Sequence, residues 1–147
     1  PDSWDVSFMS VENQENWFIG EKKTDELCDT VSSAMELVRL TQNQAPVHRD
    51  ASTSPSAERL VYGGHTIGLA QASLNRLMPG NATILGWQSC DHLGPVHEGD
   101  VLSFQHTLLD QKTLTNGKIS AIKTEVSSIK GSEISNVLDW RLVIFGA

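Results

Sequence analysis

Long apolar runs are missing from this 147-residue sequence. No stretch of about eighteen consecutive apolar residues occurs, so no membrane-spanning helix is predicted. The first residues, PDSWDVSFMS, lack the basic segment and the small-residue cleavage site of a secretory signal. The only cysteines, Cys28 and Cys90, are too few for a disulfide framework and lack the short spacing of a zinc or redox motif. These absences favour the cytoplasm and argue against a membrane partner.

Positive charge is also scarce. Eleven Lys and Arg face eighteen Asp and Glu, which gives a formal net charge of -7. Such a balance opposes long-range attraction to nucleic acid, so no nucleic-acid partner is expected. The length suits one compact domain with a real core and is too short for two ordinary ones. We therefore expect one domain over residues 1–147, with residues 1–30 the hardest to interpret.

Two helices are predicted in the first half of the chain. Ser33 and Glu36 stand in capping-box spacing before apolar residues at three- and four-residue steps, which indicates a helix over about 33–42. A second apolar stripe predicts a helix over about 66–78, ended by the Pro79-Gly80 pair. The segment between them, NQAPVHRDASTSPSAE, has the composition of a loop, and loops of this length are often functional.

After Gly80 the sequence is typical of β-strands. Four segments rich in branched and aromatic side chains are separated by turn-forming residues. Alternation places Leu102, Phe104, His106 and Leu108 on one face of the second segment. The long, small-residue helix is the obvious cover for this apolar face. We expect an α+β fold in which a curved antiparallel sheet wraps around a central helix. The four segments read ATILGWQSC, VLSFQHTLL, KISAIKTEVSSI and VLDWRLVIF.

The order of motifs resembles a known family. A helix precedes a loop with a proline two residues before a histidine, then come the glycine-rich RLVYGGHT and the strand connection GPVHEGDVL. From about Ser33 to Leu109 this order resembles the MaoC-like (R)-specific enoyl-CoA hydratases and dehydratases, which have the hotdog fold. The family loop has the form D-x-N-P-[LIV]-H. Here Pro46 and His48 match, whereas Asn43 stands at the aspartate position and Ala45 at the asparagine position.

The resemblance implies acyl-CoA chemistry with His48 as a catalytic residue. It also implies that the backbone N–H of Gly63 or Gly64 binds the thioester carbonyl oxygen. Physical chemistry supports these roles, because hydration of an enoyl thioester needs a base for water, a proton donor for the α-carbon and donors for the enolate oxygen. Imidazole serves as acid or base near neutral pH, and helix-start N–H groups bind developing negative charge.

Asn43 raises the question of the second proton-transfer group. An amide can orient a water molecule but cannot take up a proton at ordinary pH. Asp50, in the same loop, and Asp91, at the end of the first long strand, are the alternatives. We favour Asp91, because that strand end could face the start of the central helix, while Asp50 could brace its own loop.

Other polar residues receive weaker interpretations. Arg59 and Lys118, or Lys123, are candidates for contacts with CoA phosphates. The spacing of Cys90, His92 and His97 fits no standard ligand pattern, so no metal is expected. Asp91 and His92 could equally form a turn at a strand end. His65 and His106 are interpreted as structural.

Two function classes follow. The first is a hydratase or dehydratase of trans-2-enoyl-CoA or (R)-3-hydroxyacyl-CoA thioesters, including branched or dicarboxylic ones such as mesaconyl-CoA. It needs no cofactor, because the CoA thioester is the substrate. The second is a non-catalytic hotdog that binds acyl-CoA or serves as a partner subunit, and a thioesterase is a weaker third reading. Since hotdog domains usually pair through their sheets, a homodimer or a higher homo-oligomer is expected.

Overall fold

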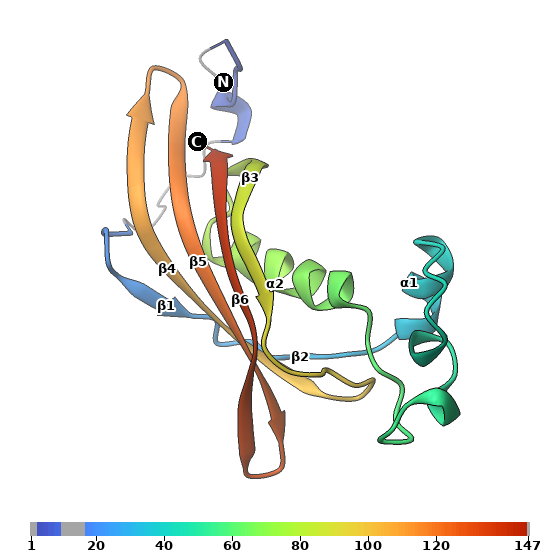
Figure 1. Ribbon diagram of the computed structural model, residues 1–147. Helices are drawn as coiled ribbons and strands as arrows, with labels where there is room; N and C mark the ends of the chain where they lie inside the picture. Colours follow the sequence, from blue (N-terminus) through green and yellow to red (C-terminus); the bar gives the residue numbers. More distant parts are fainter. Residues whose placement is uncertain (1–2, 10–16, 147) are drawn as a thin grey trace.

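The computed structural model describes residues 3–9 and 17–146. Among these residues, short 3-10 helices and strands alternate with two α-helices before the chain enters four long strands (Figure 1). Among the described helices, none combines the length and apolar character needed to cross a bilayer. The elements are η1 (Ser7–Met9), β1 (Lys22–Thr24), β2 (Asp29–Thr30), α1 (Ala34–Leu40), η2 (Pro46–His48), η3 (Ala51–Thr53), α2 (Gly63–Leu77), β3 (Asn81–His92), β4 (Val101–Leu114), β5 (Gly117–Lys130) and β6 (Glu133–Gly146).

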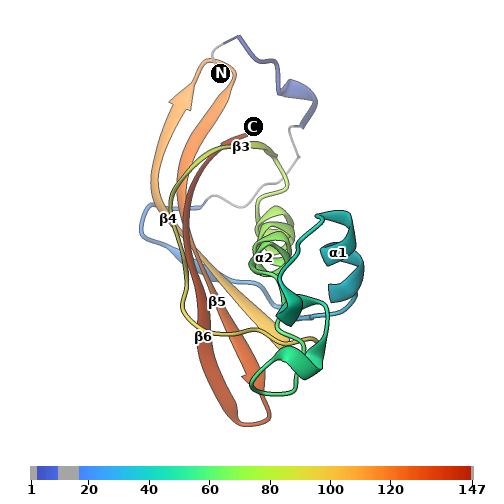
Figure 2. The ribbon, with the colours of Figure 1, turned by 45° about the vertical axis from the view of Figure 1, so that its right-hand side comes forward.

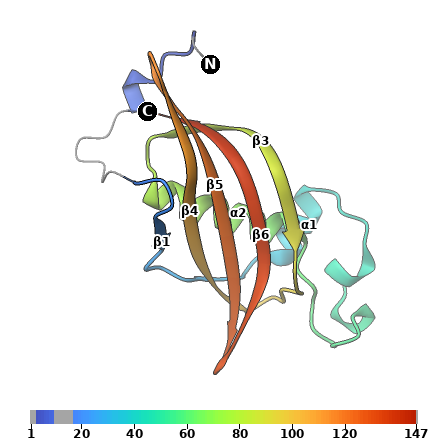
Figure 3. The same cartoon turned by 60° about the vertical axis from the view of Figure 1, so that its left-hand side comes forward.

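The strands form one antiparallel sheet in the order β1-β4-β5-β6-β3, and β2 also pairs with β4. Hairpins join β4 to β5 and β5 to β6, whereas β3 crosses over to pair with β6. The sheet curves around α2, which lies across its concave face (Figures 2 and 3). The end of β3 therefore comes close to the start of α2. The expected sheet wrapped around a central helix is confirmed.

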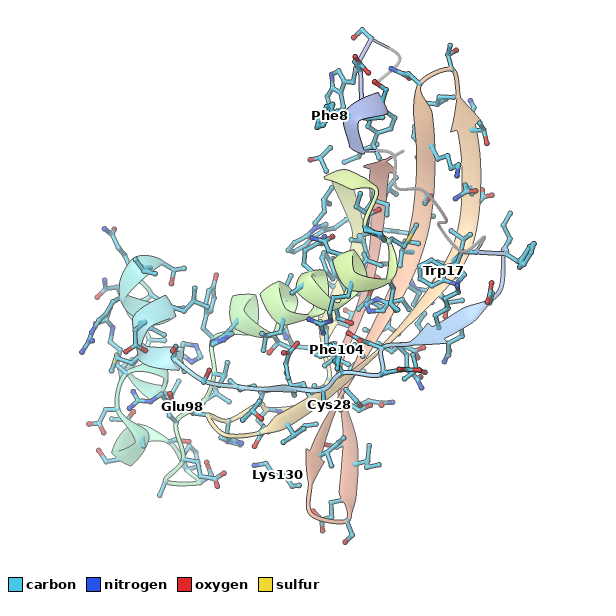
Figure 4. The ribbon with its side chains drawn as sticks, turned by 180° about the vertical axis from the view of Figure 1, so that it is seen from behind. Phe8, Trp17, Cys28, Glu98, Phe104 and Lys130 are labelled. Carbon is cyan, nitrogen blue, oxygen red and sulfur yellow. The ribbon has the colours of Figure 1, made fainter. Side chains whose placement is uncertain are left out.

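The core lies between α2 and the concave face. Leu102, Phe104, His106 and Leu108 are all fully buried, so the alternation predicted for this strand is confirmed. Figure 4 shows Phe104 between the strands and the helix. Helix α2 meets them with Ala70 and Leu74, also fully buried. Burial of this apolar surface supplies the main favourable free energy of folding. The core side of the other strands comprises Ile122, Val126, Leu138, Trp140, Leu142 and Ile144.

Several predicted boundaries are wrong. Helix α2 begins at Gly63, three residues before the predicted start, and α1 is shorter than the predicted 33–42. Ser33 precedes α1 with a left-handed backbone, φ 54°, and its side chain makes no capping hydrogen bond, so the predicted capping box does not form. Instead Glu98 accepts a hydrogen bond from the Ala34 N–H. Strands β1 and β2 were not predicted, because such short polar strands have no sequence pattern of their own.

Candidate functional site

His48 ends a single 3-10 turn that begins at Pro46. Proline restricts the backbone at the start of this turn, and the Arg49 and Asp50 N–H groups both donate to the Pro46 carbonyl. The His48 ring is half-buried, and its Nδ1 lies 2.8 Å from the carbonyl oxygen of Leu60. A carbonyl oxygen only accepts, so Nδ1 carries the proton and the neutral ring keeps Nε2 as a proton acceptor. The turn thus fixes both the position and the tautomer of this imidazole.

Two arginines brace the loop that carries His48. Arg49 Nε donates to the carbonyl oxygen of Asn43 at 2.7 Å, and Arg59 Nη1 donates to the Arg49 carbonyl at 2.6 Å. Arg59 Nε also pairs with Glu98 at 2.9 Å, which ties the loop to the connection before β4. Figure 4 shows Glu98 beside this loop. Both ends of the 43–60 segment are held by charge-assisted hydrogen bonds, so the His48 turn sits on a supported frame.

Asn43 is part of the same frame. Its side-chain oxygen accepts from the Ala45 N–H at 2.9 Å, which forms a turn within the loop. The backbone of Asn43 donates to Val38 in α1. The amide oxygen that was predicted to hold a water molecule is therefore already engaged, and the structure gives Asn43 a bracing contact.

The start of α2 is lined by two rings. A Cβ placed on Gly64 would lie 2.6 Å from Cε1 of the Tyr62 ring, and one placed on Gly63 would lie 2.6 Å from both Cε1 and Nε2 of His92. Each glycine therefore leaves room for an aromatic neighbour. The Tyr62 ring also meets His48 edge-on, with ring centroids 6.0 Å apart. Contacts link His48 to Tyr62, Tyr62 to Gly64 and His92 to Gly63 around the first turn of the helix, and we refer to these five residues as the helix-start cluster.

Asp91 is not part of the helix-start cluster. In the β3–β6 register Asp91 pairs with Asp139, whereas His92 pairs with the buried Leu138. Directly paired residues project to the same side of a sheet. Asp91 thus lies on the outer face, in a shallow depression that it shares with Asp139 and Arg141. The expected position of Asp91 is wrong, and the inward residue at this strand end is His92.

The remaining site candidates lie elsewhere. Lys118 pairs with Gly146, which packs against Gly80 at the far end of α2. Fifteen residues of helix, about 22 Å, separate this end from Gly63. Arg59 lies in the same loop as His48, but its guanidinium already donates hydrogen bonds to Glu98 and to the Arg49 carbonyl. Asp50 accepts hydrogen bonds from the N–H and hydroxyl of Ser52 and caps its own turn.

A buried polar cluster below the loop was not predicted. The buried Asp100 pairs with Lys130 Nζ at 3.1 Å and accepts hydrogen bonds from Ser128 and from the backbone of His97. Lys130 lies 3.2 Å from His97 Nδ1, while His97 Nε2 lies 3.3 Å from the Ser56 hydroxyl. This Lys130 cluster joins the loop to the β5–β6 hairpin (Figure 4). Its residues come from three segments that are far apart in sequence, at Ser56, 97–100 and 128–130, so the sequence offered no signal for it.

Burial controls the charge of two neighbouring groups. It lowers the pKa of His65, in the first turn of α2, although Glu98 acts in the opposite direction. Burial, and then the carboxylate of Asp91, raise the pKa of the Cys90 thiol. Both groups therefore favour the neutral form. Within the described part of the chain, no three His, Cys, Asp or Glu side chains are grouped to hold a metal ion.

Comparison with known proteins gives the fold. No family model matches the chain. A Mycobacterium tuberculosis protein with a double hotdog fold, a conserved hypothetical protein essential for bacterial survival during infection, superimposes with a TM-score of 0.86 and 38% identity. The match covers 98% of this chain and 45% of that protein. An (R)-hydratase from Pseudomonas aeruginosa gives a TM-score of 0.71 with 21% identity, over 88% of this chain and 81% of the enzyme. The predicted hotdog fold is confirmed.

A curated relative carries a defined activity. The mesaconyl-CoA hydratase of Cereibacter sphaeroides is 29% identical over 117 residues, which cover 78% of this chain and 34% of the relative. The solved structures that share the fold also include a putative MaoC domain dehydratase from Chloroflexus aurantiacus. The predicted likeness to MaoC-like dehydratases and (R)-hydratases is confirmed. This chain spans about a third of the curated relative and less than half of the double-hotdog protein.

Proposed function

We propose that this hotdog chain, similar to MaoC-like dehydratases and (R)-hydratases, hydrates enoyl thioesters of CoA or dehydrates their 3-hydroxy forms. The observation that carries the proposal is the helix-start cluster, in which the His48 ring, whose Nδ1 is held by the Leu60 carbonyl, lies edge-on to Tyr62 at the start of α2, where the N–H groups of Gly63 and Gly64 have no intrahelical partner. His48 Nε2 accepts a proton from water, and the helix-start N–H groups bind the carbonyl oxygen that becomes negative. The CoA thioester is the substrate, and no cofactor is required.

The likeness to mesaconyl-CoA hydratase supports a short branched or dicarboxylic acyl group as the substrate. The two unpaired cysteines, Cys28 and Cys90, support a cytoplasmic setting for this chemistry.

Assembly is part of the same proposal. Hotdog proteins are commonly dimeric, and in this sheet β3 is the terminal strand of the path on the side of β6. Leu85 and Trp87 on β3 are 39% and 53% exposed. A second hotdog unit pairing along β3 would bury both side chains. We propose a homodimer as the simplest such arrangement.

A substrate panel tests the proposed activity. Crotonyl-CoA, mesaconyl-CoA and branched enoyl-CoA thioesters are mixed with the protein, and the loss of the conjugated thioester absorbance is followed. We expect turnover of at least one thioester. Binding without turnover would instead favour a non-catalytic acyl-CoA-binding hotdog or a partner subunit, a reading that the loop-bound Asn43 oxygen favours. Release of free CoA without hydration would identify a thioesterase.

Replacement of Arg59 separates a bracing role from CoA recognition. Since its guanidinium holds Glu98 and the Arg49 carbonyl, we expect Arg59→Ala to loosen the His48 loop. The kcat should then fall by about tenfold with thioesters of CoA and of pantetheine alike, because misplacement of a catalytic group slows both reactions. Steady-state kinetics on matched acyl groups make the comparison. An increase in KM confined to the CoA thioester would instead assign Arg59 to the CoA phosphates.

A further inference from the structure

His92 belongs to the helix-start cluster but comes from β3, outside the loop that carries Asn43 and His48. It is the last residue of β3, and its ring lies against the backbone of Gly63, where α2 begins. The ring projects inward, because His92 pairs with the buried Leu138. An imidazole is therefore in contact with the same helix turn that offers N–H groups to a carbonyl oxygen.

The five histidines of this chain are all described, and they differ in how firmly their rings are held. His48 is tied to Leu60, His97 to Ser56 and Lys130, and His106 to Ser73 and Thr124. His65 has a buried Nδ1 without a hydrogen-bond partner among the described residues. His92 is exposed, and within the described chain neither of its ring nitrogens is hydrogen-bonded. Of these five described imidazoles, His92 is the one that is exposed to solvent.

The two imidazoles approach the helix start from different sides. His92 covers the Gly63 side, whereas His48 reaches the Gly64 side through Tyr62. In an enoyl thioester the α-carbon is bonded to the carbonyl carbon, and the β-carbon is one bond further away. If Gly63 binds the carbonyl oxygen, the His92 ring in contact with Gly63 is in position to protonate the α-carbon. The more distant imidazole is placed for water attacking the β-carbon.

We propose that His92 is the general acid that protonates the α-carbon, while His48 is the base for water; this assignment rests on the proposed hydratase function. Water forms a bond from its oxygen to the β-carbon and gives one proton to His48 Nε2. The π electrons of the double bond move to the carbonyl oxygen, which the helix-start N–H groups bind. The resulting enolate takes a proton from imidazolium His92 at its α-carbon. Exchange with solvent then returns a proton to His92 and removes one from His48.

Exchange of α-hydrogen tests this role without requiring hydration. Butyryl-CoA has no double bond to hydrate, so incorporation of deuterium from D2O at its α-carbon reports only proton transfer there. We expect the wild-type protein to catalyse this exchange, His48→Gln to retain it within about threefold, and His92→Gln to lose about 100-fold. Mass spectrometry of the recovered thioester gives the rates. Crotonyl-CoA hydration should fall in both variants.

A matched control lies next to His92 in the strand. Asp91→Asn changes the outer face at the same strand end, and it should leave hydration and exchange unchanged. Thermal melts of all three variants, with His92→Asn as a second replacement, verify folding.

The possible failures are distinguishable. If the wild type hydrates enoyl-CoA and folded His92→Gln hydrates and exchanges at the same rates, the assignment of His92 is wrong while the hydratase function stands. If the wild type binds thioesters but neither hydrates nor exchanges any of them, the proposed function fails, and the role of His92 fails with it.

Discussion

His48→Ala should reduce kcat for enoyl-CoA hydration by about 1,000-fold, within the range typical of lost general acid–base catalysis. The reason is local: in the proposed mechanism the ring nitrogen facing away from Leu60 is the base, and no other described side chain shares this turn with a free acceptor. Binding of the thioester should change little, because the helix-start N–H groups remain. Stopped-flow absorbance gives kcat, and titration of a non-reacting thioester gives the affinity.

Two further variants control for damage to the loop. His48→Asn places its amide N–H near the position of Nδ1 and can still donate to the Leu60 carbonyl, but it cannot accept a proton from water, so it should be as inactive as His48→Ala. Asp50→Asn keeps the acceptor for Ser52 and should stay within about threefold of the wild type. A His48→Ala protein with near wild-type turnover would remove this imidazole from the mechanism.

Acidification should reduce the free energy of unfolding by about 3 kcal/mol between pH 6.5 and pH 4 through His106 alone. Burial lowers the pKa of this ring from 6.5 to about 4; the Asp25 carboxylate opposes the shift, and the Arg76 guanidinium reinforces it. Above pH 6.5 the ring is neutral in the folded and unfolded states. Between the two values only the unfolded chain binds the proton, so stability falls as pH falls.

The hydrogen bonds of His106 explain why the folded protein keeps it neutral. Its Nε2 lies 2.9 Å from the Ser73 hydroxyl, and its Nδ1 lies 2.9 Å from the Thr124 hydroxyl. Ser73 in turn donates to Asp25; burial raises the pKa of that carboxyl, but the hydrogen bonds from Ser73 and Arg76 outweigh it and the net pKa is lowered. The chain of donors therefore runs from Thr124 through His106 to Asp25. It has no place for a second ring proton.

Urea unfolding at several pH values measures this effect. The comparison is between the wild type and His106→Asn, which keeps a polar group but does not titrate. The variant should be less stable at pH 7.5, and its stability should change less between pH 6.5 and 4.5. Equal pH dependence in the two proteins would contradict the assignment to His106. His65, whose pKa is also lowered by burial, contributes in the same direction to both proteins.

The parts of the fold that were predicted from sequence depend on local periodicity. Residues 102–108 alternate because one face of β4 is buried over this part of the strand, and Ile67, Ala70 and Leu74 repeat at helical steps. The start of α2 was predicted too late because Gly63 and Gly64 are poor helix formers, yet the two rings beside them need their lack of side chains. At this helix start the low helix propensity of glycine opposes helix formation, whereas packing against the two rings requires glycine, and the packing determines where α2 begins.

The site was predicted only in part for a similar reason. The position of His48 follows from the resemblance and a short loop motif, and the structure places that ring beside the helix start. The choice between Asp91 and His92 depends on which face each side chain takes. The β3–β6 register shifts between Ile84 and Gly86 and again between Trp87 and Ser89. Each bulge inserts an unpaired residue and changes the alternation, so sequence parity cannot assign a face beyond it.

Ionic strength should distinguish the Lys130 cluster from the charges on the outer face. Lys22 and Glu125 meet at 2.9 Å with side chains 48% and 26% exposed, so dissolved ions weaken this pair readily. Asp100 is only 5% exposed where it meets Lys130, and counterions have little access to it. In concentrated NaCl we expect exposed ion pairs on the convex surface, such as Lys22–Glu125, to weaken, while the 43–60 segment stays attached to the β5–β6 hairpin.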